Sequence, residues 1–235
     1  MASSKLAIMP SPTDILDRLQ KYLSDVLTTE RLVLSRQAKD GRLNSQENEK
    51  QISHALELYA VSNEWFQSEG LKLVVAPPRH WFDFSVTDAN GLFIPVNVKV
   101  SALKTSDNVS SKEGVFFALT GVQPNEAKIN NWEQFCSELS SRLALNLVAD
   151  YYFLVIGKDD GRAVFWTSLK QIAELVPNGN NPPFQCHWGK NRVRAQRPPT
   201  EANRYILRVL RETFRLRSEA LQSFDKHLSD HLGDL

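Results

Sequence analysis

The chain is poor in cysteine, and it has no long apolar run, no internal repeat and no large net charge. Cys136 and Cys186 are the two cysteines among 235 residues, and they stand far apart without metal-ligand spacing. This usage argues against a disulfide scaffold and fits a reducing compartment such as the cytoplasm. Without a run of about 18 apolar residues, the sequence predicts no membrane span. The first residues also lack the apolar core of a secretory signal.

Charge is balanced over the whole chain but is distributed unevenly along it. The net charge is +1, so overall composition gives no sign of nucleic-acid binding. Between His187 and Arg217, however, nine Lys and Arg residues stand against two Glu, which leaves the rest of the chain acidic. Such an asymmetry can mark a surface that binds a polyanion. The apolar fraction of 42% is sufficient for a core, and the length predicts a single domain, 1–235.

Two short apolar segments joined by a tight turn organise the middle of the chain. Residues 81–86 and 92–100 are rich in aromatic and β-branched side chains, and Asn90-Gly91 lies between them. An Asn-Gly pair in this setting is a strong signal of a β-hairpin. We therefore expect two antiparallel strands at the centre of the fold.

Three polar side chains interrupt this apolar hairpin. Asn97 and Lys99 share one face of the second strand because side chains alternate, and Asp83 lies on the partner strand. Polar groups on an apolar hairpin are costly unless they are paired or functional. The structural interpretation is that Asp83 is a strand acid that is solvated or forms a salt bridge with Lys99. The alternative is a functional site built from an acid, an amide and an ammonium group.

Periodicity predicts a mixed α/β chain of class α+β. Helical spacing indicates helices over 12–27, 45–70, 132–147, 169–176 and 200–232, whereas apolar or alternating runs indicate strands over 71–76, 81–86, 92–100, 115–120, 151–157, 162–167 and 184–188. The order helix, strand, strand, strand, helix, strand over 45–157 forms the expected core. A helical crossover before the last strand predicts a parallel neighbour. An N-terminal helical arm, 11–40, and a C-terminal basic segment with its helix, 187–233, complete the chain.

The hairpin motif and this order of elements together resemble the PD-(D/E)XK nucleases. In that family an Asp on one strand is followed on the next strand by acid-x-Lys, within an αβββαβ core. Asp83 matches the first acid, although Phe82 replaces the preceding Pro, and Asn97-Val98-Lys99 matches the second piece. The local pattern is most similar to type II restriction endonucleases of the EcoRV and HincII kind. Their preceding helix carries a Glu between apolar residues, which Glu57 matches.

The resemblance implies Mg²⁺-dependent hydrolysis of phosphodiester bonds in double-stranded DNA at a specific sequence. It implies Asp83, Asn97 and Glu57 as metal ligands and Lys99 as the group that stabilises developing charge. It also implies a homodimer in a bacterial-type cytoplasm, and the amphipathic N-terminal helix is the expected dimer element. Glu49 is a rival for Glu57, although a position near a helix N-terminus would explain an acid there without function.

Asn97 departs from the family pattern, because an amide oxygen brings no negative charge to a metal. Three interpretations stay open: the enzyme works with Asn, it is a natural variant with weakened catalysis, or the Asn is an engineered change. Other functions also remain: a non-catalytic DNA-binding protein, a repair or recombination nuclease of the same fold, and an interaction protein that docks an acidic partner.

Loops and the basic segment supply the residues expected to contact DNA. Arginine reads phosphates and guanine edges well, and polar loops can enter a groove. The expected contacts are Ser101, Lys104, Asn108, Asn180, Arg192, Arg194 and Arg197. The arginine stripe at 204, 208, 211 and 215 fits phosphate contacts and a solvated helix face equally well.

Overall fold

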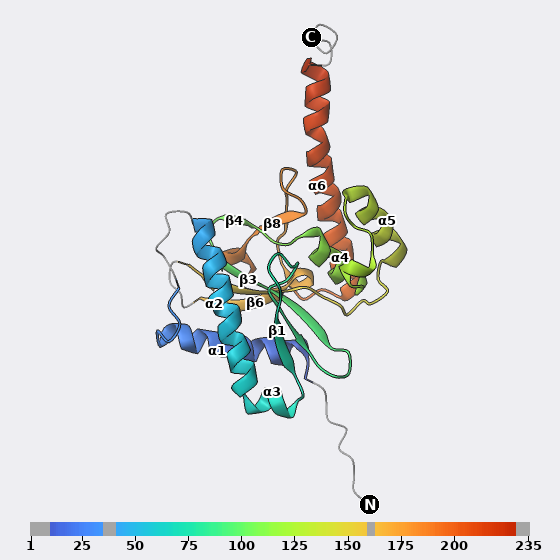
Figure 1. The fold of residues 1–235 in the computed structure, drawn as a ribbon. Helices are drawn as coiled ribbons and strands as arrows, with labels where there is room; N and C mark the ends of the chain where they lie inside the picture. Colours follow the sequence, from blue (N-terminus) through green and yellow to red (C-terminus); the bar gives the residue numbers. More distant parts are fainter. Residues whose placement is uncertain (1–9, 35–40, 159–162, 229–235) are drawn as a thin grey trace, which may run out of the picture. The chain divides into compact units, whose positions relative to one another are not determined.

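The structure is a computed structural model that describes residues 10–34, 41–158 and 163–228. These residues fall into two compact units, and the chain passes between them after Ala102, after Tyr151 and again after Trp166. We expected a single domain, so this division is a feature that the sequence did not indicate. The class of the fold is α+β, as predicted (Figure 1).

A mixed five-stranded sheet organises the described part of the first unit. Its strands are β1 (Lys72–Val75), β2 (Phe84–Thr87), β3 (Phe93–Ser101), β5 (Tyr152–Gly157) and β6 (Val164–Ser168), in the order β1-β2-β3-β5-β6. Strands β1 and β2 are antiparallel, as are β2 and β3, whereas β3 and β5 are parallel. Both the central hairpin and the parallel pairing after the crossover are therefore confirmed.

The turn between β2 and β3 forms as the Asn-Gly pair predicts. The carboxylate Oδ1 of Asp88 accepts the backbone N–H groups of Asn90 and Leu92, each at 2.8 Å. Gly91 has a φ of 96°, a conformation that glycine adopts without a steric penalty. This local bonding fixes the register of the hairpin, in which Phe84 lies opposite Val96.

Helix α1 (Pro12–Thr28) begins at a capping box. Ser11 donates its backbone N–H to the Asp14 carboxylate at 3.0 Å, and the Asp14 N–H donates to the Ser11 hydroxyl at 3.2 Å. Its apolar side chains are buried in the core of this unit, together with residues of the sheet; they are Ile15, Leu16, Leu19, Leu23 and Val26. The apolar stripe is therefore covered within the chain itself, and a dimer contact through α1 stays a prediction.

The helix expected over 45–70 is two helices, α2 (Gly41–Ser62) and α3 (Glu64–Ser68). Asn63 separates them, because its side-chain oxygen accepts the N–H groups of Trp65 and Phe66 and so caps a new helix. Helix α2 also starts four residues earlier than predicted. Glu49 therefore lies beyond its first turn, where the helix dipole no longer accounts for an acid.

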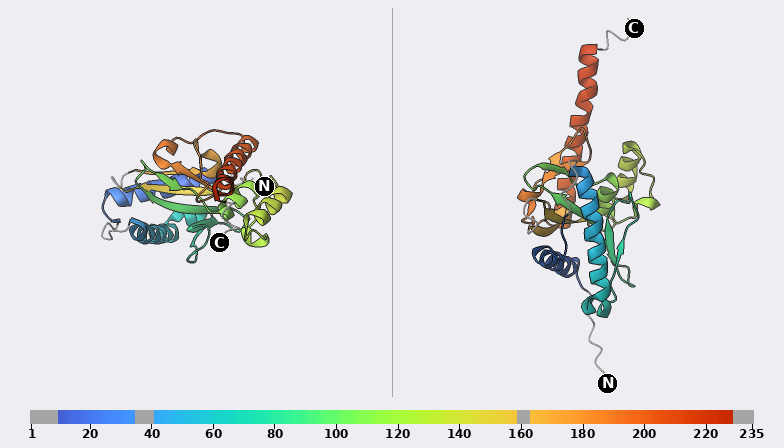
Figure 2. Two further views of the ribbon diagram at one scale, coloured as in Figure 1. Left: turned by 90° about the horizontal axis from the view of Figure 1, so that it is seen from above. Right: turned by 60° about the vertical axis from the view of Figure 1, so that its left-hand side comes forward.

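The second unit contains a three-stranded sheet and three α-helices among its described residues. Strands β4 (Ser106–Asn108), β8 (Phe184–His187) and β7 (Val176–Pro177) stand in the order β4-β8-β7, with antiparallel pairing. The helices are α4 (Lys112–Thr120), α5 (Trp132–Arg142) and α6 (Pro199–Leu228), with 3₁₀ turns η1 (Pro124–Glu126), η2 (Leu169–Gln171) and η3 (Trp188–Asn191). Aromatic contacts join α4 to α5 and α5 to α6. The long helix α6 can be followed in both views of Figure 2.

Of the elements predicted for this unit, the strand over 115–120 and the helix over 169–176 are wrong, and the helix over 132–147 is confirmed with an earlier end. The run 115–120 is part of helix α4, because Ser111 caps its start and Gly121 ends it in the left-handed conformation. The helix expected over 132–147 ends at Arg142, and the exposed Leu145 and Val148 lie in turns. The helix expected over 169–176 is only the short turn η2, after which the chain enters β7.

The described helices give no support for a transmembrane segment, because none is long and apolar enough to cross a bilayer.

Candidate functional site

Asp83 is held at the start of β2 by the main chain of β3. Its carboxylate Oδ2 accepts the N–H of Val98 at 2.6 Å, and its own N–H donates to the carbonyl of Val96 at 2.9 Å. A charge-assisted bond of this length fixes the carboxylate. The segment Asn97-Val98-Lys99 therefore lies directly against Asp83, as the sequence predicted.

The protein raises the pKa of Asp83 above its ordinary value. Burial is the main cause, and the Val98 hydrogen bond and the positive charge of Lys99 oppose it only in part. No ion pair joins Asp83 to Lys99 among the described residues. A salt bridge with Lys99, which was the structural interpretation, is therefore not what holds Asp83 in place.

Asn97 and Lys99 occupy neighbouring outward positions on β3. Both side chains are half-buried. The residues that alternate with them, Val96, Val98 and Val100, are buried, in agreement with the predicted alternation. The Oδ1 atom of Asn97 is buried and has no hydrogen-bond partner in the part of the chain that the structure describes. An unsatisfied buried acceptor costs about 1–3 kcal/mol, so this oxygen is poised to accept a ligand.

A cavity of about 650 Å³ opens between α2 and the loop that leads from β1 to Asp83. Glu49 and Ser53 of α2 line one wall, and His80 and Asp83 line the other. The remaining lining residues are Lys50, Val75, Ala76, Pro77, Pro78, Arg79 and Phe82. The cavity thus brings two acids from separate elements to one space.

The acid that shares this cavity with Asp83 is Glu49 and not Glu57. Glu57 lies two turns further along α2, where its carboxylate is 3.5 Å from the Nδ1 of His54 and its side chain is 38% exposed. Glu49 was the rival considered for this role, and it was set aside because the predicted start of α2 placed it in the first turn, where the helix dipole explains an acid.

Two residues of the cavity wall were not predicted at all. Arg79 has a φ of 67°, which is uncommon for a residue other than glycine and typical of strained functional loops. His80 packs its ring against Phe82, with 4.2 Å between the ring centroids, and burial lowers the pKa of this imidazole. The Pro77-Pro78 pair, which stiffens this loop, was the available signal.

The oxygen donors around Asp83 suit Mg²⁺, which prefers carboxylate and carbonyl oxygens. Asp83 offers a carboxylate that the Val98 N–H holds in place. Asn97, the residue before Val98, offers a buried oxygen that has no hydrogen-bond partner among the described residues. Within the described ranges, no three His, Cys, Asp or Glu side chains form a cluster of metal ligands. The set offers oxygen donors of the type that magnesium prefers, but it does not make a complete ligand cluster among the described residues.

The residues expected to contact DNA lie in different settings. Ser101 is buried at the end of β3, and its carbonyl accepts the N–H of Lys158. Arg197 donates to the carbonyls of Ile172 and Ala173 and stacks on Tyr205, so its guanidinium has a structural use. The other expected contacts belong to the second unit; Lys104, Asn108, Asn180 and Arg192 are exposed, and Arg194 is half-buried.

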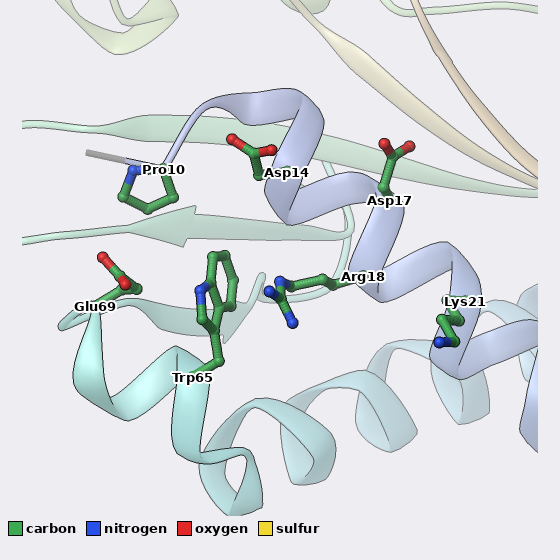
Figure 3. Close-up of a pocket in the computed structure, with 7 residues that line it drawn as sticks. All are labelled: Pro10, Asp14, Asp17, Arg18, Lys21, Trp65 and Glu69. Carbon is green, nitrogen blue, oxygen red and sulfur yellow. The ribbon is translucent and has the colours of Figure 1, made fainter. Parts of the chain in front are cut away.

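A second hollow, of about 470 Å³, lies between α1 and α3 in the first unit (Figure 3). Its charged residues already serve the fold. Arg18 stacks over the ring of Trp65 at 4.0 Å, and Asp17 accepts the indole N–H of Trp166 at 2.6 Å. This hollow therefore does not compete with the Asp83 cavity as a functional site.

Comparison with known proteins identifies no relative. No protein-family model matches the chain, and a search of the curated proteins found no match.

Proposed function

We propose that this chain is a type II restriction endonuclease of the PD-(D/E)XK kind, which hydrolyses phosphodiester bonds in double-stranded DNA with Mg²⁺. The observation that carries this proposal is the hairpin itself. The Asp83 carboxylate accepts the N–H of Val98, the residue that separates Asn97 from Lys99 in β3, and the Asn97 Oδ1 is buried with no hydrogen-bond partner among the described residues.

The proposed chemistry divides among the residues of the first unit. Asp83 and the Asn97 oxygen hold Mg²⁺, and Glu49, in place of Glu57, supplies the second negative charge. When bound, the ion polarises the phosphoryl oxygen and makes a bound water more acidic. Lys99 stabilises the negative charge that develops on the phosphate. His80, whose pKa is lowered by burial, lines the same cavity and is able to hydrogen-bond a water molecule there.

Asn97 supports one alternative, a DNA-binding protein that has kept the nuclease fold but lost catalysis. Its amide brings no charge, so the metal would be held by fewer carboxylates than in the family pattern. Such a protein would bind duplex DNA and leave it intact in the presence of Mg²⁺.

We further propose a homodimer that acts in a bacterial-type cytoplasm. A two-fold symmetric enzyme matches a palindromic DNA site, which is the usual arrangement for proteins that read such sequences. Helix α1 is the predicted contact element, although its apolar stripe is covered within the chain itself. Helix α6 exposes Leu221 and Phe224, which are 64% and 40% accessible, and exposed apolar side chains of this kind often mark contacts.

Digestion of plasmid DNA with Mg²⁺ or with EDTA, followed by sequencing of the ends, tests this function. We expect discrete fragments that share one sequence at their ends, and no cleavage with EDTA. Intact plasmid that is nevertheless bound would favour the non-catalytic alternative. A protein that neither binds nor cuts would rule out both.

The two helix acids provide a matched pair for the same assay. We expect Glu49→Gln to reduce the cleavage rate by about tenfold or more, because it removes charge from the cavity. Glu57→Gln, on the same helix, should leave the rate within about twofold. The reverse result would restore Glu57 as the metal ligand and overturn the assignment of Glu49.

A further inference from the structure

Strands β4 and β8 of the second unit carry a row of polar side chains on one face of their sheet. Ser106 lies opposite His187 and Asn108 lies opposite Gln185, so these four side chains share a face. The alternate position, Cys186, is buried on the other face. Ser106 and Asn108 are exposed and Gln185 and His187 are half-buried, so solvent reaches this row, which ends at Val176 of β7.

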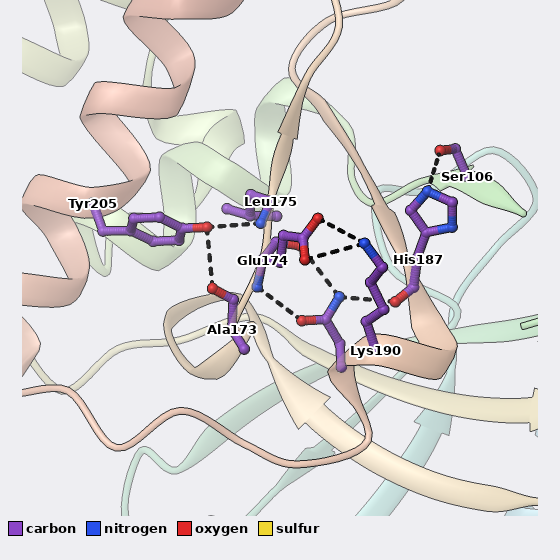
Figure 4. Close-up of polar contacts among 8 residues, drawn as sticks. Ser106, Ala173, Glu174, Leu175, His187, Lys190 and Tyr205 are labelled. Carbon is purple, nitrogen blue, oxygen red and sulfur yellow. Dashed lines mark hydrogen bonds and ion pairs between the residues drawn. The ribbon is translucent and has the colours of Figure 1, made fainter. Parts of the chain in front are cut away.

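This polar face carries one hydrogen bond of ordinary length, between Ser106 and His187, and two long ones among its amide groups. The Ser106 hydroxyl and the His187 Nε2 are 3.0 Å apart (Figure 4). The Oδ1 of Asn108 is 3.5 Å from the side-chain nitrogens of both Gln185 and Asn178, at the outer limit for such bonds. The amide groups therefore keep most of their capacity to donate and accept.

Basic residues follow in the chain next to contacts at both ends of this sheet. At one end the N–H of Gly189 donates to the carbonyl of Leu103 at 3.0 Å, and Lys190 and Lys104 are the residues that follow these two. Lys190 also pairs with the exposed Glu174, as Figure 4 shows. At the other end the loop after β7 contacts α6, because a Cβ on Gly179 would lie 2.9 Å from the backbone nitrogen of Arg217.

We propose that this polar face enters the major groove of duplex DNA and reads the edges of bases. The inference rests on the proposed function and deepens it by naming the surface that selects the DNA sequence. Its members are Ser106, Asn108, Asn178, Gln185 and His187. Asn and Gln make paired hydrogen bonds with adenine in the major groove, which also admits a β-ribbon.

The flanking charges fit the same partner. Lys104 and Arg217, beyond the two ends of the sheet, are placed to contact phosphates, which position a protein on DNA without reading its sequence. A protein partner is a poorer fit, because the centre of a protein interface is normally apolar and this face is polar.

Selection of bound sequences from a random duplex pool tests the proposal. The full-length protein is compared with Asn108→Ala/Gln185→Ala and with Gln196→Ala, an exposed residue of the same type outside the polar face. We expect the wild type and Gln196→Ala to enrich one shared sequence. The double variant should lose preference at one or two positions and bind the enriched sequence about ten- to hundredfold more weakly.

A second variant separates sequence reading from general affinity. Lys104→Ala/Arg217→Ala should weaken binding to all sequences alike and reduce the salt dependence of affinity, with the enriched sequence unchanged. Circular dichroism confirms that each variant is folded.

The remaining outcomes separate this inference from the nuclease proposal. If the double variant enriches the same sequence with wild-type affinity, the reading surface is wrong and the nuclease proposal stands. If the wild type cuts DNA without any preference for sequence, the reading surface is wrong, and the protein is a nuclease but not a site-specific one. If the wild type has no affinity for DNA, both proposals fail.

Discussion

Asp83 is a carboxylate that the fold buries at a cost. An acid whose pKa in the folded protein is raised above its unfolded value weakens the fold once pH exceeds the unfolded value. Asp83→Asn removes that charge, and the amide oxygen can still accept the Val98 N–H. We therefore expect the variant to have a higher free energy of unfolding at pH 7 and a cleavage rate lower by about a hundredfold or more.

Urea denaturation and plasmid digestion of the same preparations measure both effects. A gain in stability with a loss of activity is typical of a functional group that is strained in the free protein. Loss of stability at pH 7 would instead identify Asp83 as a structural acid, and would argue against a metal site.

Asp150 is a second buried acid, and it belongs to the structure of the second unit. Its carboxylate accepts the N–H of Tyr151 at 2.8 Å and that of Lys170 at 3.2 Å. Burial raises its pKa to about 6, against the opposing effects of the Ser168 hydroxyl and the Lys170 charge. The ammonium group of Lys170 is itself tied to the carbonyls of Leu147 and Ala149.

The pH dependence of stability follows from this raised pKa. The folded protein holds the Asp150 proton more tightly than the unfolded chain, so stability due to this group is present near pH 4 and is lost as pH rises to about 6. We expect wild type to lose up to about 3 kcal/mol relative to Asp150→Asn over that range. Urea denaturation at several pH values measures the difference. A constant difference between pH 4 and pH 7 would contradict the raised pKa.

Sequence alone was sufficient to predict the polar residues of the hairpin and insufficient for the helix acid. Alternation along a strand is a property of the backbone, so Asn97 and Lys99 could be placed before the structure was known. Glu49 was set aside in favour of Glu57 because the start of α2, misjudged by four residues, placed Glu49 in the first turn, where the helix dipole explains an acid. That Glu49 shares a cavity with Asp83 is a contact between distant segments, which only the structure shows.

At the scale of elements, α4 shows why a short apolar run is ambiguous. Residues 115–119 are all buried in the second unit, so the segment has no polar positions whose spacing would distinguish a helix from a strand. The boundaries decide the matter. Ser111 accepts the N–H of Gly114 at 3.4 Å, and Gly121 donates its N–H to the carbonyl of Phe117 at 2.7 Å.

The C-terminus of α4 yields a prediction about stability. Gly121 has a φ of 74°, and a Cβ there would lie 2.5 Å from the Cβ of Asn146. Gly121→Ala should lower the free energy of unfolding by about 1–3 kcal/mol through backbone strain alone, and further through the clash. Gly91→Ala is a matched control, since its φ is also positive but nothing lies within 4 Å of the added Cβ.

Thermal and urea denaturation of the two variants measure these losses. The greater loss is expected for Gly121→Ala. Equal losses in the two variants would mean that Asn146 moves aside and that the close contact at Gly121 is of no consequence.

At the scale of the whole molecule, the order of elements was predictable and the division into units was not. Hairpin and crossover rules operate on neighbouring segments, so the antiparallel pair β2–β3 and the parallel pair β3–β5 followed from sequence. The unit boundaries depend on contacts between distant segments, such as β4 with β8. No local pattern indicates that residues 106–108 pair with 185–187.

We predict that Asn97 limits the cleavage rate of a nuclease in which the other catalytic residues are in place. The most direct test is plasmid cleavage by wild type, Asn97→Asp and the double variant Asp83→Asn/Asn97→Asp over a range of Mg²⁺ concentrations. A carboxylate at position 97 adds charge to the metal site, so Asn97→Asp should cut at lower Mg²⁺ and at least about tenfold faster than wild type. The double variant should be inactive. If neither wild type nor Asn97→Asp cuts DNA under conditions in which a control enzyme does, the nuclease account of this protein is wrong.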